Sequence, residues 1–236
     1  MHSKIILVTL NAKYIHASFG LRYLHANMQE LAERTSILEF DINQKINDIA
    51  ESILDKSPTI LGFGIYIWNV EPTSKLVSIL RKLKPDLKII VGGPEVSYEH
   101  SEQEWLKQVD YLITGEADLA FYDLCKDLLI EPEAGRWTQK KVIHASVPDV
   151  KSIHHPYDLY ASADLENRIV YVEASRGCPF TCEFCLSSLD VPVRAFPINP
   201  FLQAMDQLFQ RGLRHFKFVD RTFNLNMNTG KAILHF

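Results

Sequence analysis

Three cysteines lie close together in the second half of the chain. Cys178, Cys182 and Cys185 occur in the segment Ser-Arg-Gly-Cys-Pro-Phe-Thr-Cys-Glu-Phe-Cys-Leu, with the spacing C-x3-C-x2-C. A structural zinc site and an ordinary iron–sulfur cluster each take four protein ligands. Three thiolates on one loop would instead hold three irons of a 4Fe-4S cluster and leave the fourth iron open to another ligand. The segment therefore predicts a reactive cluster rather than a structural one.

The remaining cysteine, Cys125, lies far upstream in the amphipathic stretch 119–130. A free cysteine in such a stretch behaves as a small hydrophobic residue, so we expect Cys125 to be buried. The alternative is a structural or electron-transfer metal protein in which Cys125 supplies a fourth ligand. Because cysteine is sparse and mostly clustered, we expect no disulfide framework and predict a reducing, cytoplasmic location.

The composition is that of a globular protein. Its 236 residues are 47% apolar, which is enough for one large or two modest domains. The net charge of −4 and the lack of a basic stripe give no signal for nucleic-acid binding. No apolar run approaches the roughly 18 residues of a membrane span, and the N-terminal apolar run is too short for a signal peptide. We therefore expect neither a membrane nor a nucleic-acid partner.

The first part of the chain alternates short apolar runs with amphipathic stretches, which predicts a parallel sheet covered on both faces. Strands are expected at residues 4–10, 36–42, 88–91 and 110–114 and in the long apolar run 59–68, and helices at 18–33, 46–56, 73–83 and 119–130. Near-continuous apolar strands indicate burial on both faces. The predicted fold is α/β, with a flavodoxin-like, doubly wound domain over residues 1–130.

Four loops follow the ends of these predicted strands, where ligands bind in doubly wound folds. They cover residues 11–20, 64–69, 92–95 and 115–117. Their glycines allow the backbone to approach a ligand closely. Turn geometry alone would explain one Gly-Gly-Pro, but the same character at three strand ends favours a ligand site. The first strand is not followed by G-x-G-x-x-G, which argues against a dinucleotide.

Residues 131–167 break the periodicity with prolines and short polar stretches, which predicts a linker with one short β-hairpin near 140–145. The pair His154 and His155 has no partner at metal-ligand spacing, so we expect a solvated linker rather than a metal site.

A second unit is predicted over residues 168–236. It has strands at 169–173 and 215–219, a helix at 200–210 and a further helix from about 228. This β-loop-α-β order is typical of the start of a partial (β/α) TIM-type barrel, which keeps its functional groups at the carboxyl ends of strands. The 68 residues from 169 onward are far fewer than the roughly 250 of a barrel, so we expect a C-terminally truncated fragment.

The cysteine loop, with Phe184 before its last cysteine and a first barrel strand ahead of it, resembles the radical SAM superfamily. The resemblance implies that Cys178, Cys182 and Cys185 hold a 4Fe-4S cluster whose open iron binds S-adenosyl-L-methionine. It also implies that Phe184 lies against the adenosine and that Asp220 meets the methionyl amino group. The usual Gly-Gly-Glu near Asp220 is replaced by Val-Asp-Arg-Thr-Phe, which puts the last assignment in doubt.

The upstream domain, with Val-Gly-Gly-Pro and Thr-Gly-Glu-Ala, resembles the cobalamin-binding domain that is fused to some radical SAM enzymes. The resemblance implies a set of cobalamin contacts: Asn11, His16, Tyr66, Gly92, Gly93, Pro94, Gly115 and Glu116. Many such domains ligate cobalt through D-x-H-x-x-G. Here the corresponding His16 lacks that aspartate, which would orient a metal-bound histidine. We therefore favour a loop that packs against the corrin, or a surface position for His16, over cobalt ligation.

The two resemblances together imply an iron–sulfur enzyme that generates a 5′-deoxyadenosyl radical for methyl transfer or another radical reaction. They imply a small-molecule substrate and a flavodoxin- or ferredoxin-type electron donor. The alternative is a non-catalytic corrinoid-binding module with a vestigial cluster loop. The sequence leaves open whether this chain is active alone.

Overall fold

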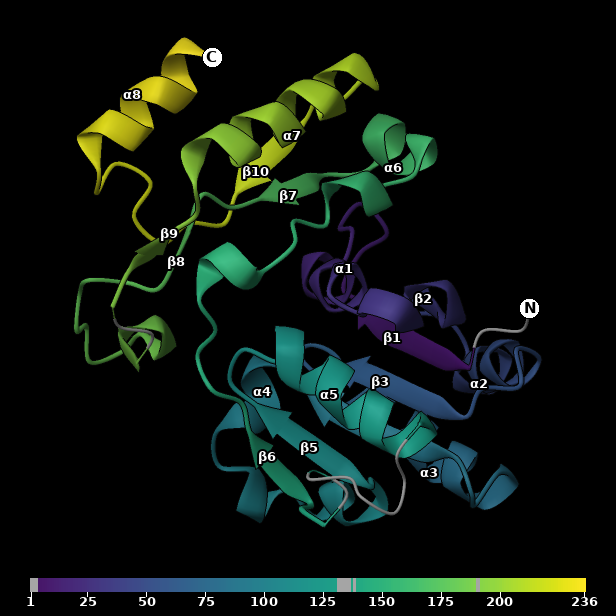
Figure 1. Ribbon diagram of the computed structural model, residues 1–236. Coiled ribbons are helices and arrows are strands. Elements are labelled where there is room, and N and C mark those ends of the chain that lie inside the picture. The colour runs from purple at the N-terminus through teal and green to yellow at the C-terminus, as the bar shows by residue number, and fades with distance from the viewer. Residues whose placement is uncertain (1–3, 131–136, 138, 190–191) are drawn as a thin grey trace. The chain divides into compact units, whose positions relative to one another are not determined.

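The computed structural model describes residues 4–130, 137, 139–189 and 192–236. The chain divides into two compact units, residues 1–148 and 149–236 (Figure 1). Among the described residues, no helix combines the length and the apolar character needed to cross a membrane.

The first unit is built on a six-stranded parallel sheet in the order β2-β1-β3-β4-β5-β6. The strands are β1 (Ile5–Asn11), β2 (Thr35–Asp41), β3 (Ile60–Gly64), β4 (Lys88–Gly92), β5 (Tyr111–Thr114) and β6 (Val142–His144). The strand order reverses between β1 and β3, which is the switch point of a doubly wound sheet. The predicted flavodoxin-like fold is therefore confirmed.

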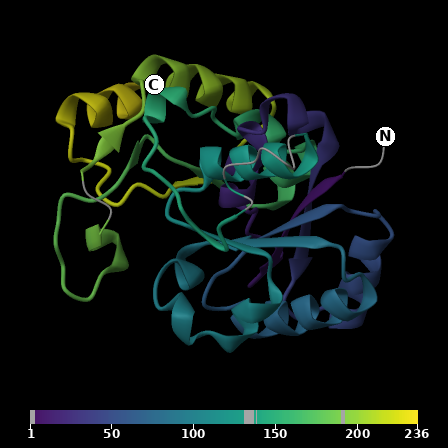
Figure 2. The same ribbon diagram turned by 60° about the horizontal axis from the view of Figure 1, so that its bottom comes forward.

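Helices cover both faces of this sheet, as the apolar strands require (Figures 1 and 2). All seven residues of β1 are buried. One face packs on α2 (Ile46–Leu54) and α3 (Val70–Leu83), and the other packs on α1 (Phe19–Ala26) and α5 (Asp118–Leu129). Shorter helical segments complete the unit: α4 (Pro94–Ser97), η1 (Gln29–Arg34), η2 (His100–Glu102) and η3 (Glu104–Gln108).

Two predicted elements of this unit differ in the structure. The helix expected at residues 18–33 ends at Ala26, because the buried Asn27 amide donates back to the Tyr23 carbonyl (2.9 Å) and Gln29 has a φ of 45°. The hairpin expected near 140–145 is wrong. Those residues form β6, which pairs in parallel with β5, so Val142 lies opposite Leu112. The first unit consequently extends past the predicted limit of 130 to Pro148.

The second unit contains one parallel strand pair joined through a helix, as expected for the start of a (β/α) barrel. β7 (Val170–Val172) and β10 (Phe216–Phe218) are paired, and α7 (Ile198–Gln210) lies between them in the chain. A short antiparallel pair, β8 (Ser175–Arg176) and β9 (Arg194–Ala195), closes the base of the cysteine loop. The remaining elements are α6 (Ser162–Asn167), α8 (Met227–His235), η4 (Val150–Ser152), η5 (Tyr157–Leu159) and η6 (Leu186–Leu189).

The histidine pair is only partly solvated. His154 is exposed, but His155 packs in an aromatic cluster with Tyr157 (ring centroids 5.2 Å apart), Phe196 (4.8 Å) and Phe201 (6.3 Å). The expected solvated linker is therefore wrong for His155, because its ring is used as an apolar surface. Its burial and then the nearby charges of Arg176 and His154 lower the pKa of His155 to about 4.

Arg81 joins three elements of the first unit at the end of the sheet where β4 and β5 begin. Its guanidinium donates to the carbonyls of Pro85 (2.8 Å), Leu87 (3.0 Å) and Gln108 (3.0 Å). It also pairs with Asp110 (2.6 Å), whose carboxylate accepts from the Ile89 amide (2.9 Å). The side chains of Arg81 and Asp110 are only 25% and 22% exposed, so water screens this pair incompletely.

We expect Arg81→Leu to lower the free energy of unfolding by about 2 kcal/mol, because three carbonyls lose a donor and the partly buried carboxylate of Asp110 loses its guanidinium partner. Chemical denaturation followed by circular dichroism measures this change. Glu104→Gln breaks the Glu104–Lys107 pair, whose side chains are 79% and 74% exposed, and serves as the control without a measurable effect. Equal stability of the two variants would contradict the role given to Arg81.

The second unit should lose stability in mild acid because of His155. Its folded pKa of about 4 lies below the unfolded value of roughly 6.5. The unfolded state therefore takes up a proton first as the pH falls, so the stabilisation is full above pH 6.5 and declines toward pH 4. Thermal unfolding at a series of pH values should show a smaller decline for His155→Phe than for wild type. His215→Gln, at an exposed position, should decline as wild type does.

Candidate functional site

The predicted cobalamin contacts all lie in the first unit, at or just beyond the carboxyl ends of its strands. Because the strands are parallel, their carboxyl ends line one side of the sheet, the ligand edge. Asn11 ends β1, and His16 lies in the loop after it. Tyr66 follows β3, Gly92 ends β4 and leads into Gly93 and Pro94, and Gly115–Glu116 follow β5. The loops predicted from separate segments are thus brought to one edge.

A buried amide joins the ends of β1 and β3 at the switch point. Asn69 is fully buried, and its Nδ2 donates to the carbonyls of Gly64 (3.0 Å) and Leu10 (3.2 Å). The same Nδ2 lies 3.4 Å from Thr9 Oγ1. Asn69 Oδ1 accepts from the Tyr66 amide (2.8 Å) and so fixes the start of the loop after β3. The sequence placed Asn69 in a candidate loop but did not reveal this role.

Backbone contacts join the loops after β3 and β4. The Ile65 amide donates to the Gly92 carbonyl (2.8 Å). Gly93 has a φ of +117°, and a Cβ atom there would lie 2.4 Å from the Ile65 carbonyl oxygen and 2.9 Å from its nitrogen. Only glycine fits this backbone conformation and this contact. The Gly-Gly pair is therefore needed to bring two loops together at the ligand edge.

A serine joins the two glycine turns after β4 and β5. Ser97 Oγ donates to the Gly93 carbonyl (2.9 Å) and accepts from the Gly115 amide (3.3 Å). Gly115 also has a positive φ, +79°. Next along the edge, Thr114 Oγ1 lies 2.9 Å from His144 Nδ1 at the end of β6. His144 could not be placed here from the sequence, because residues 140–145 were predicted to form a hairpin rather than a strand of this sheet.

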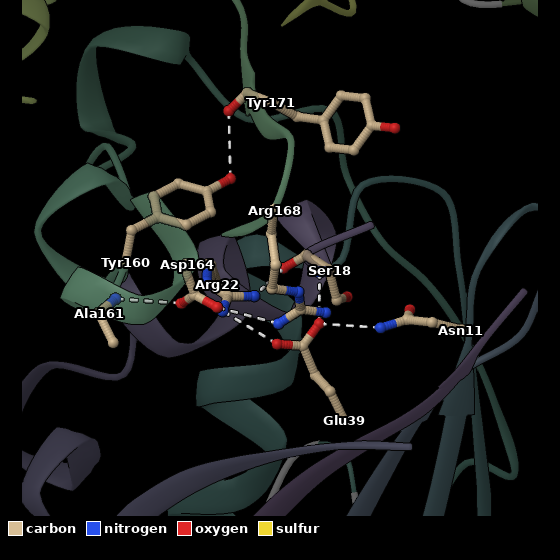
Figure 3. Close-up of polar contacts among 9 residues, drawn as sticks. All are labelled: Asn11, Ser18, Arg22, Glu39, Tyr160, Ala161, Asp164, Arg168 and Tyr171. Carbon is tan, nitrogen blue, oxygen red and sulfur yellow. Dashed lines mark hydrogen bonds and ion pairs between the residues drawn. The ribbon is translucent and has the colours of Figure 1, made fainter. Parts of the chain in front are cut away.

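Glu39 on β2 organises the loop after β1 (Figure 3). Its Oε1 accepts from Asn11 Nδ2 (3.1 Å) and from the Ser18 amide (2.5 Å). Its Oε2 pairs with the buried Arg22 (2.9 Å), which also donates to the Ser18 carbonyl (2.9 Å). The Asn11 side chain is thus used within the protein and holds Glu39. The sequence alone did not indicate this cluster, because Glu39 and its partners lie on different elements.

The ligand edge carries apolar side chains that water reaches. Ile67 is 77% exposed, Tyr14 is 63% exposed, and Ile15 and Trp68 are also exposed. The rings of Tyr66 and Trp68 stack at 4.7 Å with an angle of 3° between their planes. Burial raises the pKa of the Tyr66 hydroxyl, so it keeps its proton at neutral pH. His16, in the loop after β1, is half-buried.

These features suit a large ring with an apolar face and polar arms. Exposed aromatic and aliphatic side chains match an apolar ring face. The glycine turns allow close approach to the backbone, and a protonated tyrosine can donate a hydrogen bond. Cobalamin combines an extended corrin ring with amide side chains, so the residues at the ligand edge fit it.

The cysteine loop lies in the second unit, between β8 and β9. Cys178 is buried, Cys185 is half-buried and Cys182 is exposed, and all are free thiols. The Cys185 amide donates to the Cys182 carbonyl (3.1 Å) in a turn. Over the described residues, however, no three His, Cys, Asp or Glu side chains lie close enough to hold a metal ion. Three thiols on one loop suit an iron–sulfur cluster chemically, but the structure does not gather them.

The structure also describes the other residues considered for the cluster and for SAM: Phe184, Asp220 and Cys125. Phe184 is 94% exposed and packs against no core. Asp220 follows β10 and accepts hydrogen bonds from Ala174 and Ser175. Cys125 is fully buried in α5, and its burial raises the thiol pKa far above the ordinary range. Its predicted burial is confirmed, and an enclosed, protonated thiol is not available as a fourth ligand.

Comparisons with known proteins agree with this picture of the first unit. The sequence model of the B12 binding domain family matches residues 5–125, which is just over half of the chain. An uncharacterized methyltransferase of Pyrococcus horikoshii is 25% identical over 230 residues, covering 88% of this chain and 49% of that protein. The cobalamin-dependent radical SAM methyltransferase TokK of Streptomyces tokunonensis is 26% identical over 160 residues, covering 59% of this chain and 23% of that protein.

Among solved structures, the cobalamin-dependent S-adenosylmethionine radical enzyme OxsB with aqua-cobalamin bound superposes with a TM-score of 0.71. The identity is 18%, and the match covers 93% of this chain and 34% of that chain, so it establishes a shared fold. This chain spans about half the length of its relatives or less. It belongs to the B12 binding domain family, and it is homologous to cobalamin-dependent radical SAM methyltransferases.

Proposed function

We propose that this chain is part of a cobalamin-dependent radical SAM enzyme, with methyl transfer as the leading reaction. One observation carries the proposal: a hydrogen-bonded ligand edge in a B12 binding domain is followed, in the same chain, by three free cysteines on one closed loop. The relatives named as methyltransferases support the choice of reaction. The substrate is proposed to be a small molecule.

Cobalamin would be held at the ligand edge. The turns at Gly92–Pro94 and Gly115–Glu116 would give its polar arms access to backbone groups. Tyr66, stacked on Trp68, would offer an apolar surface and a hydroxyl donor. His16 is half-buried in the loop after β1, so we propose that it flanks the corrin rather than ligating cobalt. Asn11 would act indirectly, because its amide already holds Glu39.

The cluster would be held by Cys178, Cys182 and Cys185, and SAM by the open iron, with Phe184 free to cover the adenosine. In such enzymes the cluster supplies the electron that cleaves SAM, and cobalamin supplies a methyl carrier. The residues of this chain bind and orient these groups and exclude water. A flavodoxin- or ferredoxin-type protein would supply the electron.

A non-catalytic corrinoid-binding module is the second candidate. One observation favours it: in the part of the chain that the structure describes, the three cysteines are not gathered into a metal-binding group. Cobalamin binding without cluster assembly or SAM cleavage would select this candidate.

We expect Gly93→Ala to weaken cobalamin binding at least tenfold. The new Cβ atom would overlap the Ile65 carbonyl oxygen, which would force the two loops apart. The backbone would also hold the alanine at a φ of +117°, a strained conformation for any residue with a Cβ atom. Titration with aqua-cobalamin, followed by visible absorbance and tryptophan fluorescence, gives the dissociation constant.

The matched control is Gly212→Ala in the second unit. Gly212 also has a positive φ (+95°), but no atom lies within 4 Å of the new Cβ position, so binding should not change. Gly92→Ala, whose Cβ would meet the Ile113 carbonyl at 3.1 Å, provides a milder variant if Gly93→Ala does not fold. Wild-type affinity in both folded loop variants would refute the assignment of the ligand edge.

Replacing the loop cysteines should remove the cluster. We expect anaerobically reconstituted protein to carry about four irons per chain, and the triple serine variant of Cys178, Cys182 and Cys185 to lose nearly all of them. Cys125→Ser is the matched control and should keep its iron, because Cys125 is enclosed in α5. Iron and sulfide analysis with electron paramagnetic resonance measures both. Equal iron content in the triple variant and the control would exclude this cluster assignment.

A further inference from the structure

The carboxylate of Asp220 binds two residues at the base of the cysteine loop, Ala174 and Ser175. Asp220 lies two residues after the end of β10. The amide of the intervening Val219 donates to the Val172 carbonyl (2.9 Å) and so extends the pairing of β10 with β7. Asp220 Oδ2 accepts from the Ala174 amide at 2.9 Å, and its Oδ1 lies 3.2 Å from the same nitrogen. Its Oδ1 also accepts from Ser175 Oγ at 2.6 Å. One carboxylate therefore binds two consecutive residues of another segment.

Those two residues lead from β7 into the cysteine loop. Ser175 begins β8, which pairs with Ala195 and Arg194 of β9 over two residues on each side. The Phe196 amide adds one bond to the Ala174 carbonyl (2.9 Å). An antiparallel pair of this length is not stable by itself. The base of the loop therefore depends on contacts from outside the pair.

A second contact holds the same base from the β7 side. Arg176 Nε donates to Glu173 Oε1 (2.8 Å), and both side chains are nearly buried. The Arg176 guanidinium also lies over the ring of Phe196, 5.6 Å from its centre. Residues 173–176 are thus held from β7, from β9 and, through Asp220, from β10.

We propose that Asp220 is a positioning residue: it fixes the direction in which the chain leaves β7 and so places Cys178 for cluster binding. The last clause rests on the proposed function. Hydrogen bonds to a charged carboxylate are stronger than neutral ones, and Asp220 makes them to both the backbone and the side chain of the loop base. This role differs from the direct contact with the methionyl amino group that the resemblance implies.

Hydrogen exchange of the cluster-free chain tests the positioning role directly. We expect Asp220→Asn to speed exchange of the Ala174 amide about tenfold or more, because the amide loses its charged acceptor. Ser175→Ala should give a smaller increase, and the double variant should be less than additive because both changes act on one contact. Asp206→Asn, on the exposed side of α7, is the matched control without effect.

Reconstitution with iron, sulfide and SAM then tests the consequence. Asp220→Asn should bind less than half the iron of wild type, whereas Asp206→Asn should bind the wild-type amount. Unchanged exchange in Asp220→Asn would overturn the inference. If exchange and iron content were unchanged but the SAM-induced change in the electron paramagnetic resonance spectrum were lost, Asp220 would contact SAM instead of positioning the loop.

The two proposals fail in different ways. A wild-type chain that takes up no iron would refute the proposed function, while the exchange result would still decide the role of Asp220 at the loop base. If Asp220→Asn does not fold, Ser175→Ala decides it alone: wild-type exchange at Ala174 in that variant would overturn the inference.

Discussion

Near the ends of β1 and β3, the carbonyls of Leu10 and Gly64 need hydrogen-bond donors, and the buried amide of Asn69 supplies them. This contact lies at the switch point of the sheet, where the chain leaves neighbouring strands toward opposite faces and the ladder cannot continue. A buried polar group without a partner is costly, so the strand ends must be satisfied by side chains or by loop backbone. The rest of the ligand edge continues this solution strand by strand. The Ile65 amide donates to the Gly92 carbonyl, and the Ser97 hydroxyl links the backbones of Gly93 and Gly115. The Thr114 hydroxyl contacts the His144 ring.

The second unit meets the same requirement with a carboxylate. Asp220 at the end of β10 binds the backbone of Ala174 beyond the end of β7, as Asn69 binds the carbonyl of Leu10 near the end of β1. The charge of the side chain differs because the unsatisfied groups differ. Carbonyls need a donor such as an amide, whereas a backbone N–H and a serine hydroxyl need an acceptor. In both units a single side chain from the loop after one strand binds the backbone near the end of its neighbour.

The strands and the location of the functional loops could be predicted because they depend on local patterns. Buried parallel strands such as β1 are continuous apolar runs, and glycines follow the strands that approach other backbone closely. The bonds within the site could not be predicted in this way. Nothing near Asn69, Ser97 or Glu39 in the sequence distinguishes them from ordinary polar loop or strand residues, because their partners lie on other strands. The three-residue β6 was missed because it follows a segment rich in polar residues and is defined by its pairing with β5.

His155 shows the same limit in the opposite direction. A histidine next to a proline in a polar stretch predicts solvent exposure, but it packs against Tyr157 and against the distant rings of Phe196 and Phe201. Cys125 is the contrasting case, because its local context predicted its burial correctly. Cys125 in an amphipathic helix is enclosed, and its raised thiol pKa disfavours the thiolate that metal binding needs.

Of the loop cysteines, Cys178 is buried whereas Cys182 and Cys185 are reached by water, and the described residues do not form a metal-binding group. Metal binding can supply the free energy that orders a small loop, because the ligands are brought together only when the metal joins them. The base of this loop is already held by β9, Glu173 and Asp220. A fixed base would reduce the entropy cost of gathering three thiols, since a shorter segment would have to be ordered on metal binding. If the loop binds the proposed cluster, the strand ends would therefore influence how its thiols are gathered even though none of them carries a thiol.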